Sequence, residues 1–297
     1  MIPSMTVTST RHSTVNLGLE LAYHVWLGPA LGARGTVVFL HGFLDVGQSF
    51  DPVARALAAA GWRVVAPDQR GYGESAHVGA GGYYHFPDYI LDLYHLFEAL
   101  ALPSATLIGH SMGASVACYF AGAWPERVQA LALLDGLGPA GVPPERGPAL
   151  LRRWVSDVRL TAEREDAPMP DVATVVRRLA RTSPAATPER LAELATHAAL
   201  QGTDGQWRWR FDPLHRTTGP IPFDAQRFAT FLAAITCPVL SVWGERSPFR
   251  PPDLEARLAL IKDLVRHEIA GAGHNLHHEH PTAITAVLLA FLGGNVP

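Results

Sequence analysis

A serine flanked by glycines is the first feature of this sequence that could do chemistry. Residues 109–113 read GHSMG; they follow the apolar run ATLI and precede a stretch rich in small residues. This is the G-x-S-x-G pattern of a strand, a tight turn and a helix, in which the turn lifts a serine hydroxyl clear of the sheet edge. Gly109 and Gly113 remove side chains that would collide where strand and helix approach. The pattern predicts that Ser111 is a nucleophile.

A nucleophilic serine needs a base from another part of the chain. The loop GAGHNLHHEHP (271–281) lies between the last predicted strand and the last predicted helix, and His274 stands in it among glycines. We expect His274 to take the Ser111 proton. The neighbouring side chains could suggest a metal, but no spaced cluster of Cys, Asp or His completes a site. We therefore expect no metal. We expect the polar residues that follow His274 to flank the first turn of the final helix; they are His277, His278, Glu279 and His280.

Attack on a carbonyl also requires hydrogen-bond donors for the oxygen that becomes negative. The tripeptide HGF (41–43) follows the predicted strand TVVFL. The backbone N–H of Phe43 is expected to pair with that of Met112, just after the serine, to hold this oxyanion. His41 is expected to be a structural hydrogen bonder rather than a base.

These motifs resemble, in kind and in order, those of serine hydrolases with the α/β-hydrolase fold. HGF, DQRGYGES (68–75), GHSMG and GAGH occur in that order, and the resemblance extends over residues 19–292. It implies an eight-stranded, mostly parallel sheet, a helical cap inserted after the sixth strand, and a triad in the order Ser, acid, His. Two further stretches, GGYYHFPDYILDL (81–93) and WRWRFDP (207–213), resemble bacterial hydrolases similar to the serine hydrolase-like proteins.

The catalytic acid departs from the family pattern. In many members the preceding strand ends in W-G-x-x-D, but here Ser247 occupies the position of the acid. A neutral hydroxyl supplies no negative charge at working pH, so it cannot stabilise an imidazolium. Asp135 ends the strand LALLD, next to the strand that carries Ser111 in the expected sheet, and some relatives carry the acid there. We predict that Asp135 is the third member of the triad.

Other carboxylates are less well placed. Glu245 is the alternative acid, but it comes two residues before the usual position and would have to fold back from the turn. Asp253 lies beyond two prolines and is expected to begin a helix. Asp45 and Asp68 follow earlier strands and are expected to brace loops. The alternative for Asp135 is a purely structural role, as a helix cap or a loop hydrogen bonder.

The elements that must position these residues alternate between strands and helices. Short apolar runs are separated by segments with helical spacing, which predicts a parallel sheet covered on both faces. The runs lie at 36–40, 63–67, 105–109, 131–135 and 239–243. Between residues 137 and 235 helical patterns prevail, with Asp171 and Thr187 as helix caps and no convincing buried strand. We expect an α/β core of residues 1–136 and 236–297 and a helical cap of residues 137–235.

Composition excludes several other classes of protein. The chain has 297 residues, 48% hydrophobic and 17% charged, which is typical of a globular enzyme. A net charge of -3 without a Lys/Arg block argues against a nucleic-acid partner. The N-terminus does not resemble a signal peptide and no apolar run approaches ~18 residues, so we expect no membrane partner and a cytoplasmic protein. The two cysteines, Cys118 and Cys237, are expected to be buried rather than disulfide-bonded.

Together the motifs favour acyl transfer to water. We predict a carboxylesterase-like serine hydrolase that acts on a small-molecule ester and needs no cofactor. A serine at the turn speaks against epoxide hydrolases and haloalkane dehalogenases, which in this fold use an aspartate nucleophile. The same triad serves carbon–carbon bond hydrolases, thioesterases, lactonases and cofactor-free perhydrolases, and the fold does not choose among them. The alternative of another class is a non-catalytic, ligand-binding relative. Nothing in the sequence specifies an oligomeric state.

Overall fold

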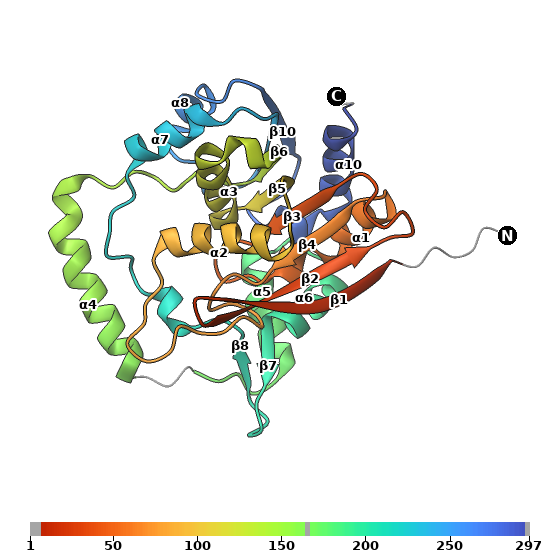
Figure 1. The fold of residues 1–297 in the computed structure, drawn as a ribbon. Coiled ribbons are helices and arrows are strands. Elements are labelled where there is room, and N and C mark those ends of the chain that lie inside the picture. The colour runs from red at the N-terminus through yellow and green to blue at the C-terminus, as the bar shows by residue number, and fades with distance from the viewer. Residues whose placement is uncertain (1–6, 164–166, 295–297) are drawn as a thin grey trace.

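One eight-stranded sheet forms the centre of the protein (Figure 1). The computed structural model describes residues 7–163 and 167–294. The strand order is β1-β2-β4-β3-β5-β6-β9-β10; β2 pairs antiparallel with both of its neighbours, and every pair from β4 to β10 is parallel. The expected mostly parallel sheet is therefore confirmed. The strands are β1 (Thr8–Asn16), β2 (Leu19–Leu27), β3 (Thr36–Leu40), β4 (Arg63–Pro67), β5 (Ala105–His110), β6 (Val128–Leu134), β9 (Val239–Gly244) and β10 (Leu264–Ile269).

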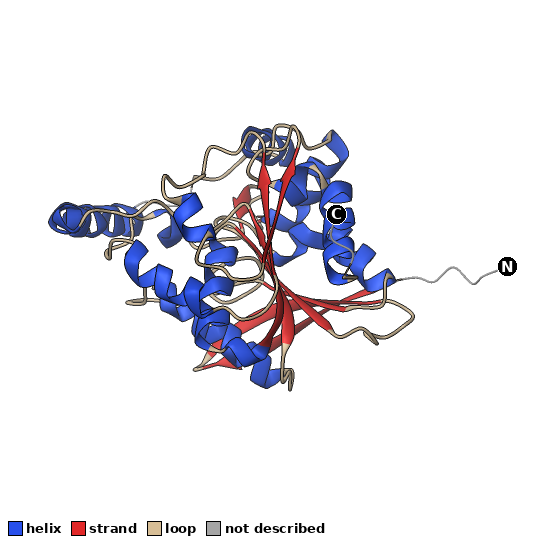
Figure 2. Cartoon of the chain, turned by 90° about the horizontal axis from the view of Figure 1, so that it is seen from above, coloured by secondary structure: helices blue, strands red, loops and turns tan. Residues whose placement is uncertain are grey.

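Helices cover both faces of the sheet, as Figure 2 shows from above. Successive side chains of a strand point to opposite faces, so Val37 and Phe39 pack on one side and Val38 and Leu40 on the other. The first side is covered by α1 (Asp51–Ala59) and α10 (Pro281–Leu292). The second is covered by α2 (Phe86–Ala99), α3 (Met112–Ala123), α7 (Ala225–Ala234) and α8 (Leu254–Leu258). Because both faces are buried at the centre of the sheet, strands β3, β5 and β9 are mostly apolar, whereas β1 at the edge is polar and exposed.

The segment between β6 and β9 is mostly helical. The predicted caps are present: the Asp171 side chain accepts from the N–H of Thr174, and that of Thr187 from the N–H of Arg190. At its end, α7 packs Phe228 into the core beside α3. The segment also holds two unpredicted antiparallel strands of three residues each, too short to show an alternating pattern. Its elements are α4 (Gly147–Glu163), α5 (Val172–Thr182), α6 (Pro188–Ala198), β7 (Ala199–Gln201), β8 (Trp207–Trp209) and α7.

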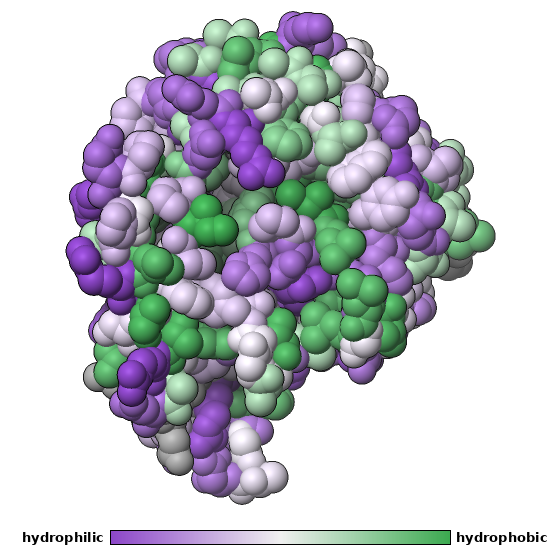
Figure 3. All heavy atoms as spheres, turned by 60° about the vertical axis from the view of Figure 1, so that its left-hand side comes forward, coloured by the Kyte–Doolittle hydropathy of each residue, from purple (hydrophilic) through white to green (hydrophobic). Residues whose placement is uncertain are grey.

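Helix α4 lies at the edge of the molecule, on the left of Figure 1. None of its residues is buried, and Leu151 and Val155 on its outer side are exposed. In the space-filling view of Figure 3, which turns this side forward, hydrophobic residues gather around a hollow in the surface. Within the described ranges, no helix combines the length and the apolar character needed to cross a membrane.

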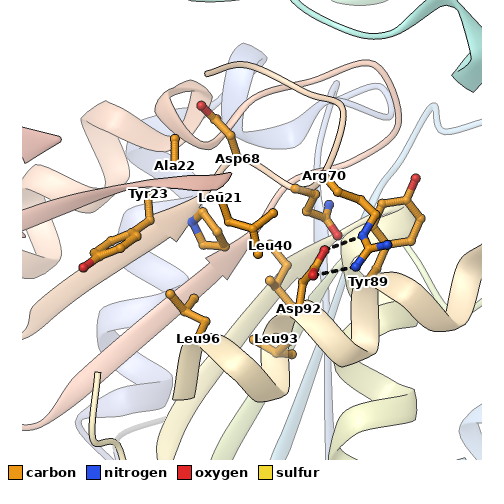
Figure 4. A pocket seen from close by; sticks show the side chains of 12 residues that line it. Leu21, Ala22, Tyr23, Leu40, Asp68, Arg70, Tyr89, Asp92, Leu93 and Leu96 are labelled. Atoms are coloured by element: carbon orange, nitrogen blue, oxygen red, sulfur yellow. Dashed lines mark hydrogen bonds and ion pairs between the residues drawn. The ribbon is translucent and has the colours of Figure 1, made fainter. Parts of the chain in front are cut away.

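A buried ion pair holds the loop after β4 against α2. The Arg70 guanidinium donates to both carboxylate oxygens of Asp92 at 2.6 Å, and the Asn16 side-chain amide donates to the same carboxylate at 2.8 Å. The pair lines a cavity of about 20 Å³ between β2 and α2 (Figure 4). That volume holds about one water molecule. The cavity is therefore too small to be a substrate pocket, and Ser111 is not among its lining residues.

Removing the negative charge of this pair should destabilise the fold. Asp92→Asn keeps the shape of the side chain but leaves Arg70, whose side chain is only 11% exposed, with a neutral acceptor, although Asp88 remains 3.3 Å away. We expect the free energy of unfolding to fall by about 2–3 kcal/mol, at or below the usual range for breaking a buried pair. Urea denaturation followed by circular dichroism measures this change. Glu255→Gln, which removes an exposed carboxylate, is the control; an equal loss of stability in both variants would contradict the prediction.

Candidate active site

Ser111 sits on a strained turn between β5 and α3. Its backbone has φ 51° and ψ -112°, a conformation that residues other than glycine rarely adopt. The turn is tight because β3, β5 and α3 approach closely: a Cβ on Gly113 would collide with the carbonyl oxygen of Leu40, and one on Gly109 would lie 2.6 Å from the nitrogen of Ala114. These are the contacts that the glycines of G-x-S-x-G make possible. Such strain persists where the surrounding structure imposes it, often at functional sites.

Three residues from different strand ends meet at this turn. His274 Nε2 lies 2.9 Å from Ser111 Oγ, and His274 Nδ1 lies 2.7 Å from Asp135 Oδ1. Asp135 is buried, whereas the His274 side chain is 18% exposed. The structure thus brings together Ser111 after β5, Asp135 after β6 and His274 after β10. This hydrogen-bonded order of hydroxyl, imidazole and carboxylate is the geometry of a catalytic triad.

The local structure directs the Asp135 carboxylate toward His274. Asp135 has φ 48°, and its N–H donates to the carbonyl oxygen of Val242 on β9 at 2.7 Å. Its Oδ2 accepts from the N–H of Gly244 at 2.8 Å, and its Oδ1 accepts from Ser247 Oγ at 2.5 Å. These donors come from the strand end and loop that carry the acid in many relatives. They fix the rotamer of the carboxylate without occupying His274 Nδ1.

Ser247 and Glu245 have structural roles that the sequence did not specify. Ser247, at the position where many relatives carry the acid, donates its hydroxyl to the Asp135 carboxylate. Its place in the W-G-x-x-D pattern was the available signal, because that position faces the triad in relatives. Glu245 is exposed and its Oε2 accepts from the N–H of Gly271 at 2.7 Å, so it braces the loop before His274 rather than contacting the imidazole.

The backbone predicted to hold an oxyanion runs beside the serine. A Cβ on Gly42 would lie 3.3 Å from Ser111 Cβ, so the chain at Gly42 passes close to Ser111. Met112 is the first residue of α3, where an N–H has no acceptor within the helix and the helix dipole favours negative charge. The participation of Phe43 and Met112 N–H groups stays a prediction. His41 Nε2 accepts from the N–H of Gln69 at 2.9 Å, as expected of a structural residue.

An exposed aromatic ring lies against the histidine. Phe249 is 62% exposed, and its ring centroid lies 4.4 Å from that of His274. Phe43, whose N–H is the predicted oxyanion donor, is also exposed, at 51%. Large exposed apolar side chains are typical of surfaces that receive a ligand. No sequence pattern pointed to Phe249, because its contact with His274 depends on the path of the loop after β9.

The remaining candidates fall into two groups. Asp68 braces two loops, as expected, through the N–H groups of Gly47 and Glu74, and Asp253 precedes α8. The expectation for residues 277–280 is confirmed in part: His280 caps the first turn of the final helix, but the chain before it forms a separate short helix, α9 (Leu276–Glu279), and buries it. His277, His278 and Glu279 lie within α9, and His280 alone precedes α10.

Comparison with known proteins agrees with this fold. Residues 35–281 match the alpha/beta hydrolase fold family. The chain belongs to this family. A serine hydrolase-like protein from Dictyostelium discoideum is 28% identical to this alpha/beta hydrolase over 293 residues, 94% of this chain and 80% of the relative. A hypothetical protein from Pseudomonas aeruginosa of known crystal structure is 31% identical with a TM-score of 0.85, over 95% of this chain and 99% of that one. A thioesterase domain from the curacin biosynthetic pathway is 27% identical with a TM-score of 0.85, over 95% and 99% of the two chains.

The choice between the two carboxylates can be tested on this alpha/beta hydrolase without knowing its substrate. We expect Asp135→Asn to slow the modification of Ser111 by a fluorophosphonate about 10³–10⁴-fold, because an asparagine fixes the wrong imidazole tautomer. Glu245→Gln should slow it less than about tenfold, since only an exposed loop hydrogen bond changes. Mass spectrometry of the intact protein against time gives both rates. The reverse order of the two variants would make Glu245 the acid.

Proposed function

We propose that this hydrolase cleaves carboxylic esters through an acyl-enzyme on Ser111. The proposal is supported above all by the continuous contact from Asp135 through His274 to Ser111, at 2.7 and 2.9 Å. A hydroxyl is a weak nucleophile until an adjacent base removes its proton. Here the base is within hydrogen-bond distance of the hydroxyl and is oriented by a buried carboxylate, which is the arrangement that acyl transfer needs.

The proposed reaction begins with the tautomer of His274. Its Nδ1–H donates to Asp135, so the Nε2 lone pair faces the Ser111 hydroxyl. As Oγ bonds to the ester carbonyl carbon, Nε2 takes the hydroxyl proton and the carbonyl π electrons move to oxygen. The N–H groups of Phe43 and Met112 donate to that oxyanion. His274 then protonates the departing alkoxide, leaving the acyl group on Ser111. Water, deprotonated by His274, attacks the acyl carbon, and the reverse proton transfer releases the acid and free serine.

The segment of residues 137–235 is proposed to act as a cap over this site. Support comes from its contacts with the loop that carries the base: the Asn275 side-chain amide donates to the carbonyl oxygen of Thr182 at 2.9 Å, and Ser183 Oγ lies 3.0 Å from His278 Nδ1. Thr182 and Ser183 end α5, in the middle of the segment. A cap held this close to the base would limit access of water and of large substrates. With the exposed rings of Phe43 and Phe249, it favours a short, apolar acyl group.

Thioester hydrolysis is the second candidate. It is favoured by the likeness to the thioesterase domain, which extends over almost the whole chain at 27% identity. The attack by Ser111 is the same in both reactions, and they differ in the leaving group that His274 protonates. A butyryl oxygen ester and the matching butyryl thioester, compared by kcat/KM, separate the two candidates. A non-catalytic, ligand-binding relative would hydrolyse neither.

Removal of the nucleophile should abolish hydrolysis without unfolding the protein. We expect Ser111→Ala to lower kcat for p-nitrophenyl butyrate by several powers of ten, because only oxyanion and binding contributions remain. The melting temperature should not fall, since the substitution is small and the glycines of the turn stay. Ser115→Ala, one turn further along α3, is the matched control and should keep its activity. Substantial kcat/KM in a folded Ser111→Ala protein would remove this serine from the mechanism.

The proposed cap should set the preference for acyl length. We expect kcat/KM to be highest for short p-nitrophenyl esters and to fall with increasing chain length. Emulsified long-chain lipid should be a poorer substrate than soluble butyrate esters, because a capped site cannot accept a lipid interface. Specific activities on graded esters and on an emulsion measure this directly. Higher activity on the emulsion would contradict the cap proposal while leaving the triad proposal intact.

A further inference from the structure

A buried cluster of histidine and aspartate side chains lies next to His274. Asp45 comes from the loop after β3, His110 ends β5 and His277 belongs to α9, and each offers a ligand atom within 4.8 Å of the others. His110 is 2% exposed, His277 is fully buried and the Asp45 side chain is 11% exposed. The sequence suggested no metal site because these residues lie far apart along the chain. The fold supplies the partners that the histidines of the last loop lacked.

Hydrogen bonds inside the cluster leave ring nitrogens unsatisfied. Asp45 Oδ2 accepts from Ser49 Oγ at 2.8 Å and lies 3.1 Å from His277 Nε2. Among the described residues, His110 Nδ1 and His277 Nδ1 have no hydrogen-bond partner, whereas His278 Nε2 lies 3.3 Å from Asp45 Oδ2. Buried polar atoms are nearly always paired, so these two ring nitrogens are open to a further partner.

His110 also has the outer contact that is characteristic of a metal ligand. Its Nε2 lies 3.0 Å from the carbonyl oxygen of His274, an acceptor, so Nε2 carries the proton and Nδ1 carries the lone pair. Histidines that bind metals almost always donate their other ring N–H to a carbonyl or carboxylate in this way. The His110 and His274 rings pack with centroids 4.8 Å apart. An ion bound at His110 would therefore act on the base of the triad through a direct contact.

We propose that Asp45, His110 and His277 form a binding site for a divalent transition-metal ion. Two imidazoles and a carboxylate are the donor set of three-ligand zinc sites, and the same donors suit Co²⁺. A fourth position would be filled by water or by His278 after a small shift of its ring. Because the ion binds the folded chain, it should also stabilise the protein against heat.

Zinc titration of the full-length, chelator-treated protein tests the site through binding rather than activity. We expect one tight Zn²⁺ per chain in competition with a chromophoric chelator, together with a rise in melting temperature. Asp45→Asn and His277→Gln should each weaken binding about 100-fold or more, since loss of an outer-shell partner alone costs 10–100-fold. His12→Gln, which removes an exposed histidine, should bind as the wild type does. His274→Gln should also retain zinc, which separates this cluster from the triad.

X-ray absorption at the zinc edge identifies the ligands of the bound ion in the wild type, so the proposal can be tested even where a variant fails to fold. The wild-type spectrum should contain scattering from two imidazoles, or three if His278 fills the fourth position, and a shell of nitrogen and oxygen only. Three results would overturn the proposal: no stoichiometric binding to the wild type, equal affinity in folded Asp45→Asn and wild type, or loss of zinc in His274→Gln. None of these results bears on ester hydrolysis, so the site and the proposed function stand or fall separately.

Discussion

The hydrogen bond between Asp135 and His274 is the contact on which the architecture of this site depends. It joins the loop after β6 to the loop after β10, although β9 lies between these strands in the sheet. Parallel strands about 4.8 Å apart bring their carboxyl ends to one edge, but the aspartate must still reach across a strand. Its positive φ and its N–H bond to Val242 turn the chain in that direction. Without this contact, Ser111 and His274 would lack the carboxylate that orients the imidazole.

For contact with His274, the position of the Asp135 carboxylate in space matters more than its position in the sequence. The loop after β9 no longer supplies an acid, yet it still takes part, because Gly244 N–H and Ser247 Oγ both donate to Asp135. Glu245, the other acidic residue of that loop, instead braces the turn at Gly271. In the proposed triad this loop supports the acid through hydrogen bonds instead of supplying it. A serine at residue 247 suits this role, because a second carboxylate there would repel Asp135.

The sequence predicted those parts of the fold and site that depend on local pattern. Glycine spacing located Ser111, the position of the last loop located His274, and strand alternation indicated the sheet, because each signal lies within a few residues. The placement of Asp135 required one further step, the adjacency of consecutive parallel strands. Contacts between distant loops gave no comparable signal: α9, the ring of Phe249 and the cluster of Asp45 with His110 and His277 all depend on side chains that only the folded chain brings together.

The proton on His274 Nδ1 provides the most direct measurement of the central contact. A short hydrogen bond from an imidazole N–H to a buried carboxylate shifts that proton far downfield in the proton NMR spectrum. We expect such a resonance in the wild type, its loss in Asp135→Asn and its retention in Glu245→Gln. A downfield proton that persists in Asp135→Asn, or that disappears in Glu245→Gln, would contradict the assignment of Asp135 as the residue that orients the base.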